Sequence, residues 1–354
     1  MTRVLLTGIG GFIGSHTAEW ILRNTDWHLI GFDSWKASHK ADRQRLTQVL
    51  DSLTAEGVDV AGRLSVYRWD LAEEFSESFK NKLLGDLDGG SVDYVINMAS
   101  DSHVTRSITD PGNCWLNNCK LIYNMLELAR WLSEHGGIKK FIQISTDEVY
   151  GDAGWDGPGH PEWDTILPSN PYSASKAAQE SLAISYWRTY SLPIIITNTM
   201  NVIGEMQDPE KFLPKALVKI NSEEEMTIHG DGPGRIAKRV WLDAKNMAAA
   251  LTFICKNVEP EMYSLDSRPK RFHIVGETEL DVLALAERLA EKLGKDLKHK
   301  LVRGDTVRPG YDRRYALVDN NLKAEGFVSP FSFDDTLERI IGWYTEHPEW
   351  LWDY

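Results

Sequence analysis

The chain has 354 residues, with 39 basic and 52 acidic side chains and a net charge of −13. This length exceeds that of one ordinary compact core and predicts two lobes. The acidic balance argues against nucleic acid or an anionic membrane as a partner. The three cysteines, Cys114, Cys119 and Cys255, form no C-x-x-C pair, so they indicate neither a zinc site nor a dithiol centre and suit a cytoplasmic protein. We expect no metal, no signal peptide and no membrane span.

Short apolar runs alternate with amphipathic runs over the first 200 residues. Repeated strand–helix units predict a parallel sheet covered by helices on both faces, which is a Rossmann-like doubly wound α/β fold. The expected strands are residues 4–7, 28–33, 64–69, 94–98, 141–145 and 193–199. The expected helices are residues 13–23, 43–53, 115–134 and 172–190.

The alternation loosens after residue 200. Expected helices at 214–221, 243–256, 279–293 and 333–346 are separated by loops rich in Gly and Pro. We therefore expect residues 1–200 to form a dinucleotide-binding domain, with a later contribution near 240–257. Residues 201–354 are expected to form mainly a smaller C-terminal substrate-binding α/β lobe. Residues 151–171, rich in Gly, Pro, Trp and Asp, are expected to form a surface loop beside the active site.

A glycine-rich turn joins the first expected strand to the first expected helix. Gly8, Gly11 and Gly14 have the spacing G-x-x-G-x-x-G, and Phe12 and Ile13 begin the helix. Glycines allow a tight turn and close approach of the backbone to a pyrophosphate, and a helix N-terminus offers free N–H groups. Such a motif is weak alone, but a strand before it and a helix after it favour a dinucleotide site.

Asp33 ends the second expected strand, where a carboxylate can accept the ribose hydroxyls of an adenosine. It would repel a 2′-phosphate, which favours NAD over NADP, although the nearby Lys36 weakens this preference. The alternative is that Asp33 caps a turn or a helix. Asp70 ends the third strand and is either near the adenine or a capping residue.

Tyr172 and Lys176 lie four residues apart and share one face of an expected helix. A nearby ammonium and a positive nicotinamide ring would both favour the phenolate, so Tyr172 could take a proton from a hydroxyl. A Y-x-x-x-K pair is common by chance, and an exposed helix pair is the alternative.

Ser145-Thr146-Asp147-Glu148 follows an apolar run at the expected end of a parallel strand, where ligands bind in open α/β sheets. Elimination of water needs one group to remove a carbon-bound proton and another to protonate the leaving hydroxyl, and two carboxyl groups can divide these tasks. The alternative is a helix N-cap with acidic first-turn residues. Both side chains face one cleft only if the chain bends at Thr146.

With these motifs in this order, the chain resembles the extended short-chain dehydrogenase/reductase superfamily, and more narrowly the NDP-sugar 4,6-dehydratases, which include dTDP-glucose 4,6-dehydratase. The likeness runs nearly end to end. The matching stretches are TGIGGFIGSH at 7–16, NMASDSHVTRSI at 97–108, ISTDEVYGD at 144–152, NPYSASKAAQE at 170–180, DPEKFLPKALV at 208–218 and RPGYDRRYA at 308–316.

The resemblance implies that Tyr172 deprotonates the sugar 4-hydroxyl while NAD takes hydride from C4, and that Lys176 assists it. Glu148 would then remove the C5 proton, Asp147 would protonate the departing 6-hydroxyl, and hydride would return to C6. Thr146 would position the substrate. The product would be a 4-keto-6-deoxy sugar.

The resemblance also implies the binding residues. Those expected to contact NAD are Gly8, Gly11, Phe12, Ile13, Gly14, Asp33, Ser34, Lys36, Asp70, Leu71, Met98, Ala99, Ser100, Asn117, Tyr172 and Lys176. Those expected to contact the nucleotide sugar are Ser102, Thr146, Asn201, Lys211, Arg235, Arg239, His273, Arg308 and Tyr311.

The chain departs from the family pattern at three places. Val202 and Ile203 stand where the family usually has Asn and Tyr, and His273 replaces an Asn near the nucleotide base. The family's Arg-Asp-Trp stretch corresponds to residues 234–241, and either Arg235 or Arg239 could meet the diphosphate. These changes leave the reaction type intact and the nucleobase and sugar open.

The family is generally dimeric, and the helices around 118–132 and 172–190 would pair in a four-helix bundle. Two alternatives to the dehydratase remain open. One is another nucleotide-sugar enzyme on the same scaffold, namely a 4-epimerase, a decarboxylase or a 5,6-dehydratase. The other is a non-catalytic NAD-sensing module, which the presence of both Tyr172 and Lys176 disfavours.

Overall fold

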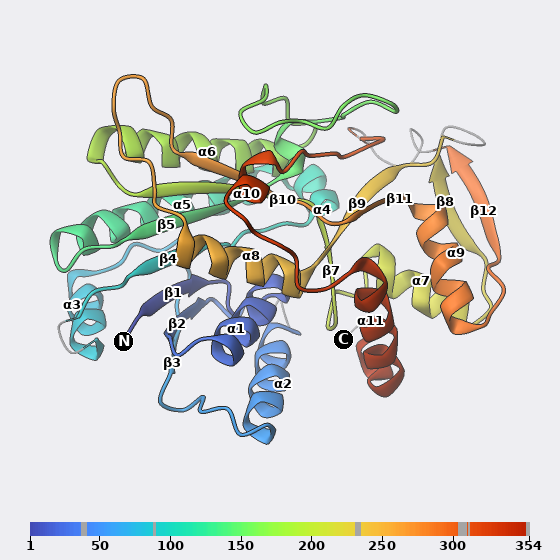
Figure 1. Ribbon diagram of the computed structural model, residues 1–354, viewed down its shortest axis with the longest axis horizontal. Helices are drawn as coiled ribbons and strands as arrows, with labels where there is room; N and C mark the ends of the chain where they lie inside the picture. Colours follow the sequence, from blue (N-terminus) through green and yellow to red (C-terminus); the bar gives the residue numbers. More distant parts are fainter. Residues whose placement is uncertain (37–40, 88–89, 231–234, 304–309, 311, 352–354) are drawn as a thin grey trace.

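The structure is a computed structural model that describes residues 1–36, 41–87, 90–230, 235–303, 310 and 312–351 (Figure 1). Its centre is a seven-stranded sheet in the order β10-β6-β5-β4-β1-β2-β3, in which all neighbours are parallel. The strands are β1 Arg3–Thr7, β2 His28–Asp33, β3 Leu64–Arg68, β4 Tyr94–Asn97, β5 Lys140–Thr146, β6 Ile194–Thr199 and β10 Lys270–Ile274. The doubly wound α/β fold expected from the sequence is confirmed.

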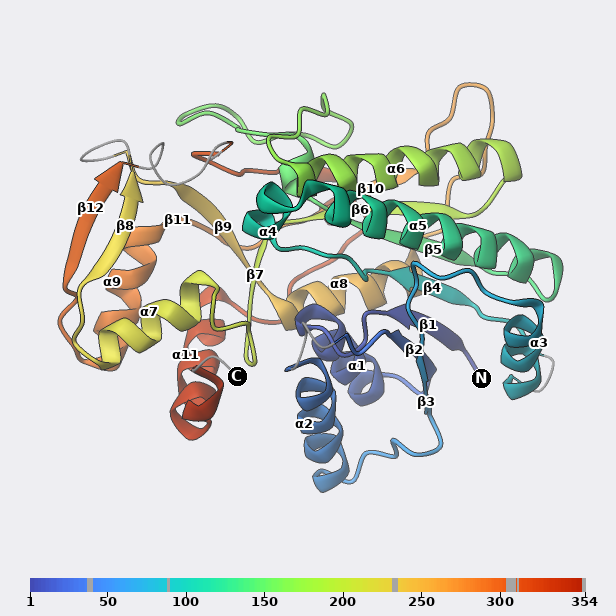
Figure 2. The same cartoon turned by 180° about the vertical axis from the view of Figure 1, so that it is seen from behind.

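Helices cover both faces of this sheet, and successive residues of a strand pack against opposite layers. Val4 and Leu6 of β1 belong to one core with α1 (Phe12–Asn24), α2 (Ala41–Ala55) and α8 (Ala244–Asn257). Leu5 belongs to a second core with α3 (Glu77–Asp86), α5 (Pro111–Glu134) and α6 (Pro171–Tyr190). Figures 1 and 2 show α1 and α8 on one side of the sheet, and α5 and α6 on the other.

The second lobe lies beyond the carboxyl ends of the large sheet (Figure 1). It contains a three-stranded sheet and a two-stranded parallel pair, flanked by helices. Its elements are β7 Asn201–Ile203, β9 Lys238–Asp243, β11 Thr278–Asp281, β8 Met226–Gly230, β12 His299–Arg303, α7 Phe212–Asn221, α9 Val282–Leu293 and α11 Phe333–Glu346. Shorter pieces are α4 Val104–Thr109, α10 Asn320–Ala324 and the 3₁₀ turn η3 Pro348–Leu351. No helix in these residue ranges is long and apolar enough to cross a membrane.

The chain returns to the large sheet after residue 200, through α8 and also through β10, whose strand character the sequence analysis did not predict. The expected helix at 279–293 was wrong over its first three residues. Thr278–Asp281 is strand β11, and the helix begins at Val282 because Asp281 accepts a hydrogen bond from the amide of Ala284 at 2.8 Å.

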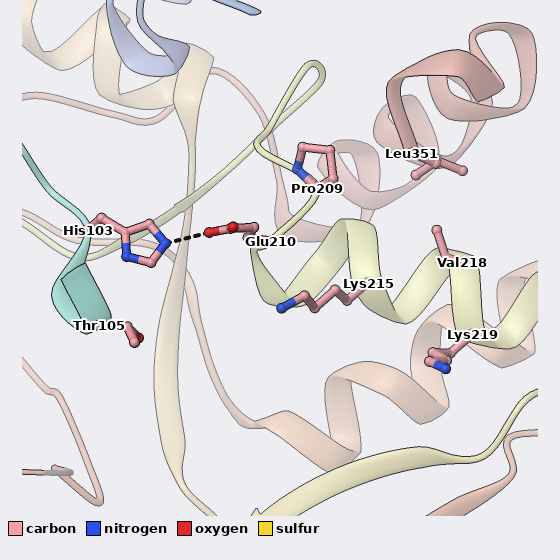
Figure 3. Close-up of a pocket in the computed structure, with 8 residues that line it drawn as sticks. All are labelled: His103, Thr105, Pro209, Glu210, Lys215, Val218, Lys219 and Leu351. Carbon is pink, nitrogen blue, oxygen red and sulfur yellow. Dashed lines mark hydrogen bonds and ion pairs between the residues drawn. The ribbon is translucent and has the colours of Figure 1, made fainter. Parts of the chain in front are cut away.

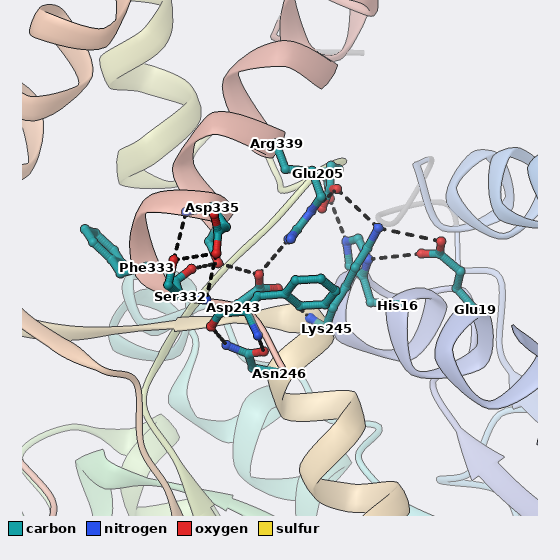
Figure 4. A network of polar contacts seen from close by, with 12 residues as sticks. His16, Glu19, Glu205, Asp243, Lys245, Asn246, Ser332, Phe333, Asp335 and Arg339 are labelled. Carbon is teal, nitrogen blue, oxygen red and sulfur yellow. Dashed lines mark hydrogen bonds and ion pairs between the residues drawn. The ribbon is translucent and has the colours of Figure 1, made fainter. Parts of the chain in front are cut away.

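A buried ionic cluster ties the glycine-turn helix to the second lobe (Figure 4). Glu205, in the loop after β7, accepts from Arg339 Nε of α11 at 2.7 Å and lies 3.3 Å from Lys245 Nζ of α8. The backbone carbonyl of Glu205 also contacts His16 Nε2 of α1 at 2.9 Å. Burial alone would raise the pKa of Glu205, but these neighbouring positive charges hold it at about 2. The two lobes are therefore joined by a paired charge network.

Candidate active site

The turn after β1 has the shape that a dinucleotide pyrophosphate requires. Gly8 has a φ of +71°, and a Cβ atom on Gly14 would lie 1.8 Å from the carbonyl oxygen of Gly8. Gly11 is the N-cap of α1 and supplies no side-chain cap, so the first amides of Phe12 and Ile13 are left for a ligand. The glycines thus permit a helix N-terminus to approach a phosphate closely, and the residues fit the cofactor.

Asp33 hydrogen-bonds to the backbone of the glycine-rich turn. Its two carboxylate oxygens accept from the amides of Gly10 and Trp35, each at 3.0 Å. Lys36 lies 3.1 Å from Asp70 Oδ2 and donates to Asn117 Oδ1 at 3.2 Å. Its charge is therefore partly neutralised, which reduces the attraction for a 2′-phosphate that the sequence had suggested.

Asp70 also caps the turn that follows β3, because its Oδ1 accepts from the amide of Ala72 at 3.1 Å. Ser34 directly follows β2, and Leu71 lies in the turn after β3. Ser34 is half-buried and Leu71 is buried. The capping role that the sequence left open for Asp70 is present.

The end of β4 lies against the glycine turn. The hydroxyl of Thr7 accepts from the amides of Met98 and Ala99, each at 3.0 Å. A Cβ atom on Gly8 would lie 3.2 Å from Ala99 Cα. The half-buried Met98, Ala99 and Ser100 are thus gathered with the glycines at the carboxyl edge of the sheet, although they are distant in sequence.

The catalytic candidates stand where β5 ends. The chain bends there into the 3₁₀ turn η1, Asp147–Val149, and the Thr146 hydroxyl accepts from the amide of Glu148 at 3.3 Å. The sequence analysis weighed an N-cap against a catalytic site, and the structure has the capping geometry at a functional position. The bend expected at Thr146 is confirmed, so the two acids no longer alternate as they would in a strand.

Asp147 and Glu148 have different surroundings. Asp147 is 5% exposed, and Thr146 donates to its Oδ1 at 2.9 Å, while its Oδ2 has no hydrogen-bond partner among the described residues. Burial, and then the charge of Glu148, raise the pKa of Asp147 to about 7. Glu148 is half-buried and accepts from Asn170 Nδ2 at 2.9 Å. The pair can therefore supply one acid and one base near neutral pH.

Tyr172 and Lys176 are buried on α6, whose N-terminus is fixed by a capping box at Asn170. Lys176 Nζ donates to the carbonyl of Ile144 and to Gln179 Oε1, both at 2.7 Å. Burial lowers the pKa of Lys176 to about 8, against the opposing charge of Glu180. Burial and the two carboxylates raise the pKa of Tyr172, so the phenol stays protonated in the protein alone.

A buried chain of polar side chains, which the sequence analysis missed, connects the glycine turn to Lys176. Thr7 donates to Asn97 at 3.0 Å, and Asn97 donates to Gln143 at 2.8 Å. Gln143 then donates to Gln179 at 3.1 Å, and Gln179 accepts from Lys176. The signal for this chain was present, since Asn97 and Gln143 are polar residues within otherwise apolar strands.

The expected substrate residues of the second lobe fall into two groups. Arg235 and Lys211 are exposed at the lobe surface. Arg239 is buried, stacks over Tyr315 at 4.3 Å and donates to the carbonyl of Asp312 at 2.9 Å. The charge of Arg239 also acts on the pKa of Asp147, which places Arg239 near the catalytic turn.

Asn201 is the first residue of β7 and is half-buried, and Ser102 is exposed in the loop between β4 and α4. His273 is fully buried on β10, with its ring nitrogens bonded to the Tyr150 hydroxyl at 2.9 Å and to the Val318 carbonyl at 2.8 Å. It therefore offers no free atom to a nucleotide base in this structure. Arg308 and Tyr311 lie outside the described residues.

A pocket of about 550 Å³ is lined by none of the catalytic candidates Thr146, Asp147, Glu148, Tyr172 and Lys176 (Figure 3). It lies between the start of α4 and α7, beside Ser102 and Lys211. It is lined by His103, Thr105, Pro209, Glu210, Lys215, Val218, Lys219 and Leu351. His103 and Glu210, two of its lining residues, pair with each other and join the start of α4 to the segment before α7.

A family model described as GDP-mannose 4,6 dehydratase matches residues 5–339. The chain belongs to this family. It is 32% identical to a dTDP-glucose 4,6-dehydratase of Neisseria meningitidis, with 99% of the chain and 95% of that protein covered. It is also 32% identical to a trifunctional UDP-glucose 4,6-dehydratase/epimerase/reductase of Arabidopsis thaliana, but spans only 48% of that protein.

Solved structures show the same fold. The dTDP-glucose 4,6-dehydratase DesIV of Streptomyces venezuelae, solved with NAD and TYD bound, has a TM-score of 0.80 and 28% identity, covering 99% of this chain and 98% of its own. A UDP-glucuronic acid 4-epimerase of Bacillus cereus has a TM-score of 0.78 at 22% identity, covering 98% of this chain and 100% of its own, which shows a shared fold.

Proposed function

We propose that this chain is an NAD-dependent lyase that converts an NDP-hexose into its 4-keto-6-deoxy derivative, with dTDP-glucose as the first substrate to test. The observation that supports this most strongly is the acid pair beside Tyr172. Asp147, with a pKa raised to about 7, and Glu148, held by Asn170, provide the acid and base that water elimination needs.

The chain's own groups divide the reaction as follows. Tyr172, as the phenolate that a positive nicotinamide ring would favour, would accept the proton of the sugar 4-hydroxyl, and Lys176, one helical turn further along α6, is held by Ile144 and Gln179. Glu148 removes the C5 proton, which a 4-keto group makes acidic. Asp147, protonated in part near pH 7, donates a proton to the departing 6-hydroxyl. Bound NAD supplies the hydride acceptor for C4 and the donor for C6.

NAD binding is assigned to the glycine turn and its neighbours. The amides of Phe12 and Ile13 would hold the pyrophosphate, and Asp33 would accept the adenosine ribose hydroxyls. Asn201, Lys211 and one of Arg235 and Arg239 would hold the sugar nucleotide. Of the two arginines, we favour Arg235 for a direct phosphate contact, since it is exposed whereas Arg239 is bonded to backbone carbonyls and stacked on an aromatic ring.

We also infer a homodimer built on α5 and α6. Three large apolar side chains of α5 are exposed, namely Trp115 at 43%, Leu116 at 59% and Tyr123 at 46%. Tyr190 at the end of α6 is 47% exposed. These side chains are spread along two packed helices, from the start of α5 to the end of α6, and exposed apolar side chains on such a face support an interaction surface. The inferred location is the cytoplasm, which suits three cysteines that are all free.

The direct test is incubation of the purified protein, saturated with NAD, with dTDP-, UDP- and GDP-glucose, followed by NMR of the products. A substrate carrying deuterium at C4 should yield a 4-keto-6-deoxy sugar with deuterium at C6. A 4-epimerase would instead leave the deuterium at C4. Absence of a 4-keto-6-deoxy product from every NDP-hexose would refute the proposal.

A further inference from the structure

An ion pair without access to solvent lies beneath the catalytic turn. Glu180 is on α6, four residues after Lys176 and eight after Tyr172, and Arg271 is on β10. Their side chains are 0% and 2% exposed, and Glu180 Oε2 accepts from Arg271 Nη2 at 2.8 Å. A buried ion pair is weak support for stability, because desolvation offsets much of its attraction, so its presence calls for another explanation.

The pair is anchored to the residue that precedes the acids. Asn198 of β6 donates through Nδ2 to Glu180 Oε1 at 2.7 Å and to the backbone carbonyl of Thr146 at 3.1 Å. Its Oδ1 accepts from Arg271 Nη1 at 3.1 Å. Asn198 thus uses its whole amide to join both charges to the end of β5.

The pair is also anchored to the residue that follows η1. Arg271 Nη1 donates to the Tyr150 hydroxyl at 2.9 Å, and this hydroxyl lies 2.9 Å from His273 Nε2. The carbonyl of Val318, 2.8 Å from His273 Nδ1, can only accept, so Nδ1 carries the hydrogen and Nε2 accepts from Tyr150. Burial, which holds the pKa of His273 at about 3, keeps this ring neutral. The hydrogen bonds of Arg271 Nη1 and Nη2, Tyr150 and His273 therefore each have a defined direction, whereas Arg271 Nε has no hydrogen-bond partner among the described residues.

We propose that Glu180 and Arg271 are positioning residues that clamp the two ends of the turn from Thr146 to Tyr150. The clamp holds Asp147 and Glu148 in register with Tyr172, because one end of the clamp belongs to the same helix as Tyr172. The ring of Trp163 packs against the Arg271 guanidinium, with 4.3 Å between Arg271 Cζ and the ring centroid. The inference rests on the proposed dehydration. It adds two residues that take no part in the chemical steps and act by holding the turn in place.

The clamp predicts a selective defect. Oxidation at C4 depends on Tyr172 and Lys176, which α6 carries. Elimination depends on the acids of η1, which the clamp aligns. Loss of the clamp should therefore slow elimination more than oxidation, since a displacement of about 1 Å can lower a rate by ~100-fold.

The test compares three variants with the wild type. Glu180→Gln/Arg271→Met removes both charges of the pair together, but it also removes the carboxylate that opposes the burial of Lys176, so Tyr150→Phe, which leaves Glu180 in place, is read beside it. Tyr150→Phe removes a single hydroxyl and only the second anchor. Lys140→Met is the matched control: Lys140 is a buried cation at the opposite end of β5, 3% exposed and bonded to the Cys255 carbonyl at 2.6 Å.

Two readouts are used on NAD-saturated protein. In the double variant we expect product formation from dTDP-glucose to fall about tenfold or more. Reduced cofactor, followed by its absorbance at 340 nm, should accumulate because oxidation at C4 continues. Amide hydrogen exchange should rise in residues 145–151. Tyr150→Phe should show both changes to a smaller extent, and Lys140→Met should show neither even if its melting temperature falls.

Wild-type product formation and unchanged exchange of residues 145–151 in the double variant would overturn the proposal, as would equal changes in Lys140→Met. If the double variant does not fold, Tyr150→Phe decides the question by the same two readouts. If the wild type forms no product from any NDP-hexose, the proposed function fails, and the exchange data alone then decide whether the pair clamps the turn.

Discussion

Replacement of Asp147 by Asn should stabilise the enzyme at neutral pH while abolishing dehydration. The buried carboxyl has a pKa of about 7 in the folded protein, against an ordinary value of 3.8. A group whose folded pKa is raised contributes stability that is present below about pH 4 and is lost as the pH rises to about 7. Asn keeps the oxygen that accepts from Thr146 but carries no charge. The stability of the variant therefore does not fall in this way as the pH rises.

The magnitude follows from proton linkage. Each pH unit over which only the folded form holds the proton changes the free energy of unfolding by about 1.4 kcal/mol. Between pH 5 and pH 7 the wild type should thus lose about 3 kcal/mol relative to Asp147→Asn. The new amide hydrogens of Asn lack a partner, so the substitution also lowers the free energy of unfolding of the variant by about 1–3 kcal/mol. This loss is the same at every pH.

Urea unfolding of both proteins at pH 5, 6 and 7, at the same NAD concentration, measures this difference. Titrating groups that do not interact with Asp147 are shared and cancel in the comparison, so the difference reports Asp147 together with Glu148, whose charge acts on it. A stability difference that stays constant over this pH range would refute the assignment of a raised pKa to Asp147, and with it the physical basis for its role as the acid.

Three further substitutions test the site and the assembly. Tyr172→Phe should lower turnover by ~100- to 10,000-fold and leave NAD affinity, measured by calorimetry, nearly unchanged; equal turnover would exclude Tyr172 as the base. Gly14→Ala places a Cβ 1.8 Å from the Gly8 carbonyl oxygen, so NAD binding and the melting temperature should both fall; retained affinity would contradict the close-approach role. Leu116→Asp should convert a dimer into a folded monomer in light scattering, with unchanged circular dichroism, whereas a persistent dimer would place the interface elsewhere.

The strand ends of the catalytic edge were predictable because local sequence determines them. Strand β2 has the predicted bounds, and β5 ends one residue beyond the predicted end, at Thr146. The polar Ser-Thr-Asp-Glu stretch after an apolar run marked both the end of the strand and the site. Such a boundary depends on neighbours in the chain, so the residue pattern carries the information.

The clamp was not predictable for the opposite reason. Lys270–Ile274 forms β10 although it contains Arg271 and His273, which a hydrophobic pattern assigns to the surface. Arg271 is paired by Glu180, Asn198 and Tyr150, which come from segments at least 70 residues away, and His273 is paired by Tyr150 and the Val318 carbonyl. A pairing over such separations leaves no periodic signal in β10 itself.

Tyr172 shows how burial changes a conclusion drawn from spacing. The four-residue separation predicted that Lys176 would favour the phenolate, but Lys176 Nζ is bonded to the Ile144 carbonyl and to Gln179. Burial and the neighbouring carboxylates then raise the pKa of the phenol. In the protein alone the phenol therefore stays protonated near neutral pH, and the proposed role of Tyr172 as a base depends on the positive charge that a bound nicotinamide ring would supply. The buried hydrogen bonds from Thr7 through Asn97, Gln143 and Gln179 connect the glycine turn to Lys176, on the same helix as this phenol, and such a pairing across four segments could not be read from the Y-x-x-x-K spacing.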